Sequence, residues 1–216
     1  MSLGEVNYMK FAGMVQRELA NELPGFRAQQ KMAPSIREGY NGISLPKAQA
    51  RQSAVLVLLF IANRKVCTLF IKRTVYNGPH SGQVSFPGGK AEGSDTSIQQ
   101  TALREAQEEV GVNSSDVILI GDLTPLHIPV SNMMVNPVVG YAIKSPTFYL
   151  NLQEVEYSIV APLDDLLNPS NRCVKVISPR GIPVTAPYYN IANEMIWGAT
   201  AMILSEFLEI IQRIRL

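Results

Sequence analysis

The segment of residues 88–112 constrains the fold of this chain more than any other part of the sequence. A pair of glycines opens the segment and predicts a tight turn. Further along, Ser97 and Gln100 have the spacing of a capping box, which marks the start of a helix. Gly111 is suited to end that helix in the left-handed conformation. The sequence therefore predicts a glycine turn followed by a helix over residues 98–110.

Three carboxylates cluster on this predicted helix. Residues four apart lie within about 40° of each other around a helix, so Glu105 and Glu109 point the same way and Glu108 flanks them. Like charges at this spacing destabilise an isolated helix by roughly 0.2–0.5 kcal/mol. The cluster is either an ordinary solvated helix face or a site compensated by a hard cation such as Mg²⁺ or Mn²⁺.

The pattern resembles the box of the Nudix hydrolases, G-x5-E-x7-R-E-U-x-E-E-x-G-U, where U is an aliphatic residue. Gly89 matches the opening glycine, and the second half of the box matches at Arg104, Glu105, Ala106, Glu108, Glu109, Gly111 and Val112. One extra residue lies between the two halves. Asp95 is the only acidic residue near the place of the family's first glutamate.

A longer spacing of this kind is found in a Nudix branch that cleaves coenzyme A. That branch also carries the upstream signature L-L-T-x-R-S-x3-R-x3-G-x3-F-P-G-G. Residues 69–89 read LFIKRTVYNGPHSGQVSFPGG and are similar to it; the matching positions are Leu69, Arg73, Gly82, Phe86, Pro87, Gly88 and Gly89. The resemblance implies that this region, Gly88 included, contacts the substrate.

Gly78 stands where the second arginine of that signature belongs. If the arginine holds a substrate phosphate in the family, another cation must do so here. Arg73, Lys72 and His80 are the candidates near that position.

The resemblance also implies the metal ligands. Glu105 and Glu109 would bind Mg²⁺ or Mn²⁺ directly, and Glu108 would do so directly or through water. The carbonyl group of Gly89 would be a backbone ligand, because glycine lets the main chain approach an ion closely.

Arg104 and a general base complete the expected catalytic set. Arg104 either orients the carboxylates by charge-assisted hydrogen bonds or is a plain helix-surface partner. The base that activates water is expected to be Glu108, Glu109 or Glu154. Glu154 lies in a predicted loop outside the box and could equally be an ordinary exposed acid.

Composition narrows the class of protein. With 46% hydrophobic residues, a chain of 216 residues can bury one substantial core. A net charge of +1 gives no global field that would attract nucleic acid or a membrane surface. The two cysteines, Cys67 and Cys173, are expected to be buried thiols in a reducing compartment, with the cytoplasm as the default. The apolar run 54–62 is too short for a transmembrane helix and predicts a buried strand.

We therefore expect an α+β protein. The expected fold is a Nudix-type α/β/α sandwich with a mixed β-sheet, forming a single domain over 1–216 with a core at about 53–190. The terminal helices would pack on that core. Helices are predicted at 5–22, 98–110, 162–167 and 197–213, and residues 26–50 are predicted to be mostly irregular. Strands are predicted near 53–61, 66–72, 117–128, 135–144, 155–161, 172–177 and 183–190.

The resemblance implies metal-dependent hydrolysis of a diphosphate bond in coenzyme A or acyl-CoA, giving 3′,5′-ADP and 4′-phosphopantetheine or its acyl form. One alternative is another nucleotide substrate, such as ADP-ribose, a dinucleotide or a nucleoside triphosphate. A second alternative is a Nudix module that binds a nucleotide without turning it over. The expected partner is a small nucleotide-like molecule, with a homodimer left open and neither nucleic acid nor membrane expected.

Overall fold

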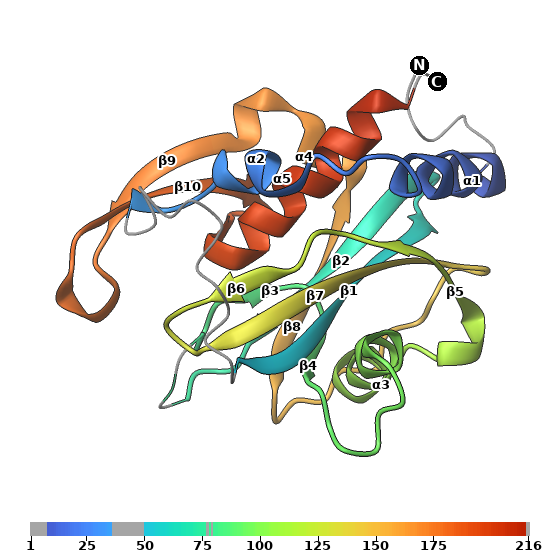
Figure 1. Ribbon diagram of the computed structural model, residues 1–216, viewed down its shortest axis with the longest axis horizontal. Helices are drawn as coiled ribbons and strands as arrows, with labels where there is room; N and C mark the ends of the chain where they lie inside the picture. Colours follow the sequence, from blue (N-terminus) through green and yellow to red (C-terminus); the bar gives the residue numbers. More distant parts are fainter. Residues whose placement is uncertain (1–7, 36–49, 77, 79, 215–216) are drawn as a thin grey trace.

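The computed structural model describes residues 8–35, 50–76, 78 and 80–214 (Figure 1). Its helices are α1 (Tyr8–Leu19), α2 (Gly25–Gln30), α3 (Ile98–Val110), α4 (Leu163–Leu167) and α5 (Gly198–Arg213), with short 3-10 helices η3 (Ser114–Asp116), η4 (Pro169–Asn171) and η5 (Pro179–Gly181). Its strands are β1 (Arg51–Ala62), β2 (Lys65–Arg73), β3 (Val84–Ser85), β4 (Gly88–Lys90), β5 (Val117–Asp122), β6 (Leu126–Ile128), β7 (Met133–Ala142), β8 (Val155–Pro162), β9 (Arg172–Ile177), β10 (Val184–Ile191) and β11 (Glu194–Trp197).

Eight of these strands form the main sheet. The order along its path is β3-β2-β1-β7-β5, while β8 pairs with β2, β4 pairs with β1, and β6 pairs with β7. The long strands β1 and β7 run parallel, whereas the other pairs in this sheet are antiparallel. The predicted mixed sheet and α+β class are confirmed.

Helices cover both faces of this sheet (Figure 1). Successive side chains of a strand point to opposite faces, and β1 is buried on both of them. On one face, Leu56 and Leu58 belong to a cluster with Ala102, Ala106 and Val110 of α3. On the other, Val57 and Leu59 belong to a cluster with the buried faces of α1 and α5, including Phe11, Val15, Leu204 and Phe207. The result is the predicted layered sandwich, with α3 alone on its side of the sheet in Figure 1.

Helix α3 begins and ends where the sequence predicted. The Ser97 hydroxyl oxygen accepts the N–H of Gln100 at 3.1 Å, and Gly111 ends the helix with φ of 71°. The Gln100 side chain accepts the N–H of Thr96, at 2.7 Å, instead of that of Ser97. The capping box is therefore half formed, and the reciprocal bond reaches one residue further back.

Strands β9 and β10 lie where strands were predicted at 172–177 and 183–190, but β11 was not predicted, nor was the separate sheet β11-β10-β9 that the three strands form. Strands β10 and β11 are joined at Ala192 and Asn193, which have positive φ angles of 51° and 63°. Two such residues are typical of a type I′ hairpin turn, but without the usual glycine the turn gives a weak sequence signal. As a result Trp197 ends a strand and precedes α5 instead of starting the helix as predicted.

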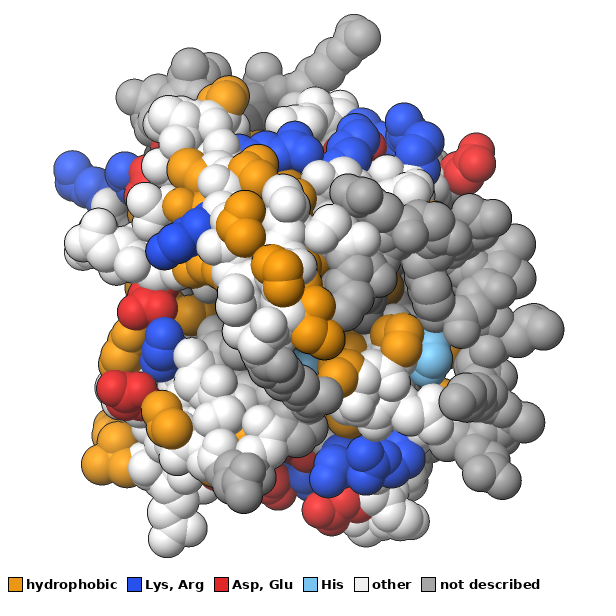
Figure 2. All heavy atoms as spheres, turned by 90° about the vertical axis from the view of Figure 1, so that its left-hand side faces the viewer, with side chains coloured by type: hydrophobic (Ala, Val, Ile, Leu, Met, Phe, Trp, Pro, Cys, Tyr) orange, Lys and Arg blue, Asp and Glu red, His pale blue; other side chains and the backbone are white. Residues whose placement is uncertain are grey.

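The small sheet projects from the sandwich at the left of Figure 1. Figure 2 looks at the molecule from that side and shows hydrophobic side chains gathered in a band across the face. Val174 and Val176 of β9, and Ile182 in the turn that follows, are exposed.

The region from Pro24 to Gln30 also differs from the prediction of mostly irregular structure. Helix α2 starts at Gly25, directly after the proline expected to end the first helix, and it packs against α5. The first helix ends at Leu19, earlier than the predicted residue 22, and Pro24 is the N-cap residue of α2. A proline is tolerated where a helix begins, so the dipeptide predicted to stop one helix starts another. The residues predicted as helix at 5–7 lie outside the described part of the chain.

The two cysteines are free, with Cys67 buried and Cys173 half-buried. The apolar run at 54–62 is part of strand β1, as predicted. No helix in the described part of the chain is long and apolar enough to span a membrane.

Candidate active site

The glycine turn lies directly against the first half of β1. Strand β4 pairs antiparallel with β1, with Val55 opposite Gly88 and Ala54 opposite Gly89. Gly88 has φ of 154°, and a Cβ atom on it would collide with the carbonyl oxygen of Ala54. A Cβ on Gly89 would collide with the carboxylate of Glu105 on helix α3. Only glycine at both positions lets the strand, the turn and this carboxylate approach so closely.

Glu109 lies at the centre of this arrangement, with only 1% of its side chain exposed. Its carboxylate accepts the N–H of Gly88 at 2.8 Å and a guanidinium N–H of Arg73 at 3.1 Å. Burial raises the pKa of Glu109 from 4.5 to about 7 and outweighs the lowering by the Gly88 N–H and by Arg73, while the nearby charges of Glu105 and Glu154 add smaller increases. The protein thus compensates this negative charge only in part.

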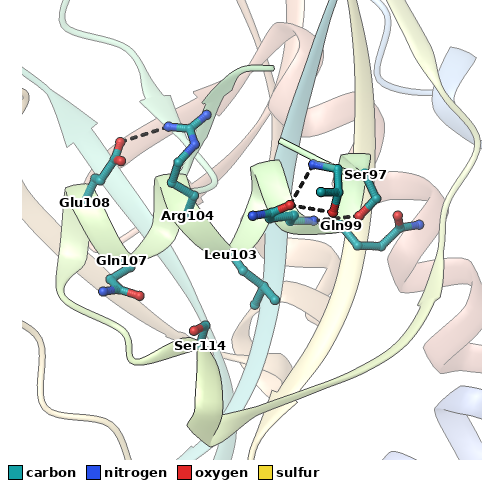
Figure 3. A pocket seen from close by; sticks show the side chains of 9 residues that line it. Ser97, Gln99, Leu103, Arg104, Gln107, Glu108 and Ser114 are labelled. Carbon is teal, nitrogen blue, oxygen red and sulfur yellow. Dashed lines mark hydrogen bonds and ion pairs between the residues drawn. The ribbon is translucent and has the colours of Figure 1, made fainter. Parts of the chain in front are cut away.

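The other two box glutamates differ in their surroundings. Glu105 points toward the glycine turn, and burial raises the pKa of its carboxyl. Glu108 is 54% exposed and pairs with Arg104 at 3.0 Å on the outer side of α3 (Figure 3). The helical spacing therefore gave the right direction for Glu105 and Glu109, with Glu108 at the edge.

Arg104 connects the parts of the box. Its guanidinium holds Asp95 through two bonds of 3.0 Å, from Nε and from Nη2. Nη1 contacts Glu105 at 3.1 Å as well as Glu108, and Nη2 also donates to the carbonyl oxygen of Lys90 at 2.9 Å. These contacts favour the orienting role over that of a plain helix-surface partner.

Asp95 is the main acidic partner of Arg104. The hydrogen bonds from Arg104 hold the pKa of Asp95 well below its usual range, and Thr101 donates a further hydrogen bond at 2.9 Å. Aspartate is one methylene shorter than glutamate, yet Asp95 reaches the guanidinium at 3.0 Å. The sequence identified Asp95 as the acidic residue beside the insertion. It did not reveal that Asp95 contacts Arg104.

The carboxylates of the site differ in how well they are placed to bind a metal ion. In the described residues, no three His, Cys, Asp or Glu side chains are grouped so as to hold a metal ion. The reason is that Glu108 faces outward to Arg104, while Glu109 is engaged by Gly88 and Arg73. The remaining donors still suit a hard divalent cation, because Glu105 and Glu109 both have raised pKa values and Glu105 lies against the Gly89 backbone.

Glu154 reaches the same site from the loop between β7 and β8. Its carbonyl oxygen accepts the N–H of Thr74 at 2.9 Å, which joins this loop to the segment after β2. Its charge contributes to the raised pKa of both Glu105 and Glu109. The structure therefore brings the predicted loop acid to the box carboxylates.

A cavity of about 650 Å³ opens beside the glycine turn. Its polar wall includes Arg51, Ser53, Arg73, His80, Ser85, Gly88, Gly89, Lys90 and Glu154, and its apolar wall includes Phe86, Ile128, Met133, Val135 and Ile203. A wall with both characters suits a ligand that carries charged groups and an apolar part.

Two polar atoms on this wall lack partners. Arg73 Nε and Ser85 Oγ are buried and form no hydrogen bond with any described residue. A buried donor without a partner is costly, so both atoms are suited to a ligand that brings oxygen acceptors. Ser85 was missed by sequence reasoning, although it directly precedes the Phe86-Pro87 pair of the signature.

The remaining predicted substrate residues have different positions. His80 lines the cavity, with its ring nitrogens 3.2 Å from Gln83 Oε1 and 3.4 Å from Ser131 Oγ. Lys72 does not line it: its ammonium pairs with Glu194 of β11 at 2.8 Å.

The exposed Gly78, at the place of the family's arginine, lies beside an aromatic ring. A Cβ there would be 2.6 Å from the ring of Tyr76. A longer side chain at this position would require Tyr76 to move.

A second hollow lies on the outer face of α3 (Figure 3). Leu103, Gln107 and Ser114 line it together with Arg104 and Glu108, but Glu105 and Glu109 do not. The cavity beside the glycine turn is instead lined by Gly88 and Arg73, which donate to Glu109, and by Gly89, which lies against Glu105, so it is the candidate active site.

The sequence is similar to known proteins of one family. The sequence matches the family model of the NUDIX domain over residues 50–170. It is 35% identical over 162 residues to an "Uncharacterized Nudix hydrolase NudL" of Photorhabdus laumondii, covering 75% of this chain and 86% of that protein. A protein of the same name from Yersinia enterocolitica is 32% identical over 195 residues, covering 90% of this chain and 94% of the relative.

A solved structure shares the fold. The Nudix hydrolase RenU of M. smegmatis aligns with a TM-score of 0.51 and 14% identity, covering 77% of this chain and 89% of that one. At this identity the similarity concerns the fold alone.

Proposed function

This chain belongs to the Nudix hydrolase family, and on that premise we propose that it cleaves the diphosphate bond of coenzyme A or of an acyl-CoA. The products would be 3′,5′-ADP and 4′-phosphopantetheine or its acyl form. The observation that carries the proposal is that Arg73, Phe86, Gly88 and Gly89, four residues of the coenzyme A signature, line one cavity beside the box carboxylates.

Nudix hydrolases generally use divalent metal ions, and we propose Mg²⁺ or Mn²⁺ here. The residues that would hold the ion are Glu105, Glu109 and the Gly89 carbonyl, with Glu108 joining if it leaves Arg104. When bound, such an ion neutralises phosphate charge and lowers the pKa of a bound water.

The substrate's diphosphate is bound, in this proposal, by donors on the cavity wall. Arg73 Nε and Ser85 Oγ need acceptors, and phosphate oxygens would supply them. Arg73 is already fixed by Glu109, so its guanidinium is held in place before the substrate arrives. His80, at the same wall, is a further candidate for a phosphate contact.

Glu154 is the general base that the geometry favours. It lines the cavity, whereas Glu109 is engaged by two donors and Glu108 faces the outer side of the helix. A carboxylate in this position can take the proton of the attacking water and then release it to solvent.

Purified protein incubated with coenzyme A and Mg²⁺ or Mn²⁺ tests the proposal. Chromatography should show 3′,5′-ADP and 4′-phosphopantetheine appearing in equal amounts, and both should disappear when EDTA removes the ion. Absence of both products, together with turnover of a different nucleotide, would overturn the substrate and leave the reaction type standing.

A second candidate is a different nucleoside diphosphate derivative, such as ADP-ribose or a dinucleotide. The observation that favours it is Gly78, which provides no cation where the coenzyme A signature has one. A panel of coenzyme A, ADP-ribose, diadenosine polyphosphates and nucleoside triphosphates at equal concentration ranks the two candidates by kcat/KM.

A further inference from the structure

We propose that Arg51 and Lys90 form a second anion-binding subsite, which takes a phosphomonoester of the substrate separate from its diphosphate. This inference rests on the proposed hydrolysis of a coenzyme A-type substrate, whose ribose carries such a phosphate. Neither residue was identified from the sequence, and neither belongs to the conserved positions of the box as written above.

The strand register places the two cations together. Lys90 of β4 lies directly opposite Ser53 of β1, and Arg51 lies two residues before Ser53 on the same strand. Their side chains therefore share one face of the sheet. Diagonal neighbours of this kind are about 7–8 Å apart, within reach of one another for long side chains. Both residues line the same cavity as Arg73 and Ser85.

Neither cation has a carboxylate partner in the described part of the chain. Among the described residues, no Asp or Glu pairs with either Arg51 or Lys90. Arg51 donates one hydrogen bond, of 3.1 Å, to the carbonyl oxygen of Ser131, which fixes its guanidinium without neutralising it. Two uncompensated positive charges on one wall favour an anionic ligand there.

The backbone of Lys90 is held by the catalytic box itself. Arg104, which orients Glu105 and Glu108, also donates to the Lys90 carbonyl oxygen at 2.9 Å. The position of the lysine relative to the box carboxylates is therefore fixed by a direct bond, even though its side chain is exposed.

The subsite is distinct from the place of the diphosphate. Gly89 faces Glu105 and helix α3, so the neighbouring residue Lys90 points to the opposite face of the sheet, where α5 lies. Arg73 reaches Glu109 on the α3 side. A substrate that uses both walls must carry two anionic groups separated by a spacer. Coenzyme A meets this requirement, because its ribose separates the diphosphate from the phosphomonoester.

This arrangement also accounts for the missing arginine. Gly78 supplies no charge, and Lys72 is paired with Glu194 away from the cavity wall. Arg51 and Lys90 supply the cations from β1 and β4 instead.

The experiment compares coenzyme A with 3′-dephospho-CoA, which lacks only the phosphomonoester. The quantity measured is the ratio of kcat/KM for the two compounds, for the wild-type enzyme and for Arg51→Gln, Lys90→Gln and the double variant. A charge-assisted contact contributes roughly a factor of ten. We expect a wild-type preference for coenzyme A of about a hundredfold, about tenfold in each single variant, and a ratio near one in the double variant.

The matched control is the double variant Arg64→Gln, Lys65→Gln. It removes two positive charges at the opposite end of β1, one in the exposed turn and one at the exposed first residue of β2, and should leave the wild-type ratio unchanged. The ratio should also fall as ionic strength rises, because exposed charges are screened by salt. Thermal unfolding of each variant shows whether it is folded at the assay temperature.

Three results would count against the subsite. Equal kcat/KM for the two compounds in the wild-type enzyme overturns it and leaves the proposed function intact. A wild-type preference that survives in the double variant means that the phosphate is bound elsewhere, and also overturns it. Turnover of neither compound overturns the proposed function, and the subsite with it.

Discussion

Two buried glutamates on opposite sides of the main sheet are compensated in different ways. Glu206 of α5 is fully buried, and Glu109 of α3 is 1% exposed. The Glu206 carboxylate accepts hydrogen bonds from the Gly25 N–H at 3.1 Å, the Gln29 side chain at 2.8 Å, and both the hydroxyl and the N–H of Thr124 at 2.6 and 3.3 Å. Glu206 thereby joins α2 and the β5–β6 loop to α5.

Glu109 has fewer donors. It accepts hydrogen bonds from the Gly88 N–H and from Arg73, and the charges of Glu105 and Glu154 lie nearby. The difference teaches that burial alone does not identify a catalytic acid. A buried carboxylate surrounded by fixed donors stabilises the fold, whereas one left partly uncompensated is suited to a cation.

The largest expected effect is on the rate in Glu109→Gln. Glu109 is a proposed metal ligand, and loss of such a ligand removes several kcal/mol of transition-state stabilisation, so kcat should fall by roughly 10²–10³-fold. The fold should persist, because glutamine keeps an oxygen acceptor for the Gly88 N–H. Steady-state hydrolysis and thermal unfolding of the same preparation check both parts. Wild-type turnover in this variant would contradict a catalytic role of Glu109, and the proposed functional difference between Glu109 and Glu206 would be lost.

Glu206→Ala should lower the stability of the fold without lowering the rate. It leaves the buried donors of Gln29 and Thr124 without an acceptor, and the free energy of unfolding should fall by about 3 kcal/mol. Urea denaturation measures that loss, and Glu206→Gln, which retains one acceptor oxygen, should lose less. Both variants should keep the wild-type kcat at temperatures where they are folded. A large loss of kcat in a folded Glu206 variant would contradict a purely structural role.

Asp95→Asn should have a smaller effect on the rate. The neutral side chain weakens the hold on Arg104, which contacts Glu105 and Glu108 and which we propose orients the box carboxylates, so kcat should fall by about 10–100-fold. Asp116→Asn is the matched control, since Asp116 pairs with the exposed Lys144 at 3.0 Å and lies outside the box. An Asp95 variant as active as this control would show that the pair does not position the box.

Lys72→Met should have the smallest effect. Its ion pair with Glu194 is partly exposed, so the loss should be below about 1 kcal/mol of stability. The KM for coenzyme A should change by less than about twofold, because the ammonium group is not on the cavity wall. A tenfold rise in KM would show that Lys72 contacts the substrate, contrary to its position outside the cavity wall.

Most of the correct predictions concern features that are determined by residues close together in the chain. The ends of α3 followed from Ser97 and Gly111, and the shared direction of Glu105 and Glu109 followed from helical spacing. These features depend on residues close together in the chain, so their physical cause lies within one segment.

Features that depend on strand register could not be predicted. Lys90 shares a face of the sheet with Arg51 only because β4 pairs with β1 in one register, and Ser85 reaches the cavity only through its pairing with β2. The same holds for Glu206, whose donors lie about 80 and 180 residues away in the chain. Sequence spacing carries no information on contacts of that range.

The raised pKa of Glu109 has a definite consequence for stability in the metal-free protein. Between pH 4.5 and about 7 the folded state keeps a proton that the unfolded state releases. Stability from this group is therefore fully present below pH 4.5 and is lost as the pH rises to about 7. The loss is about 3 kcal/mol, from roughly 1.4 kcal/mol for each pKa unit. Glu109→Gln should not show it.

The most direct test of the central claim measures unfolding free energy at pH 8, with and without Mn²⁺, for the wild-type protein and Glu109→Gln. The claim is that the charge of Glu109, which Gly88 and Arg73 compensate only in part, is stabilised further by a bound divalent ion. It predicts that Glu109→Gln is the more stable of the two without metal, and that Mn²⁺ stabilises the wild-type protein much more than the variant. Equal stabilisation of both by Mn²⁺ would contradict it.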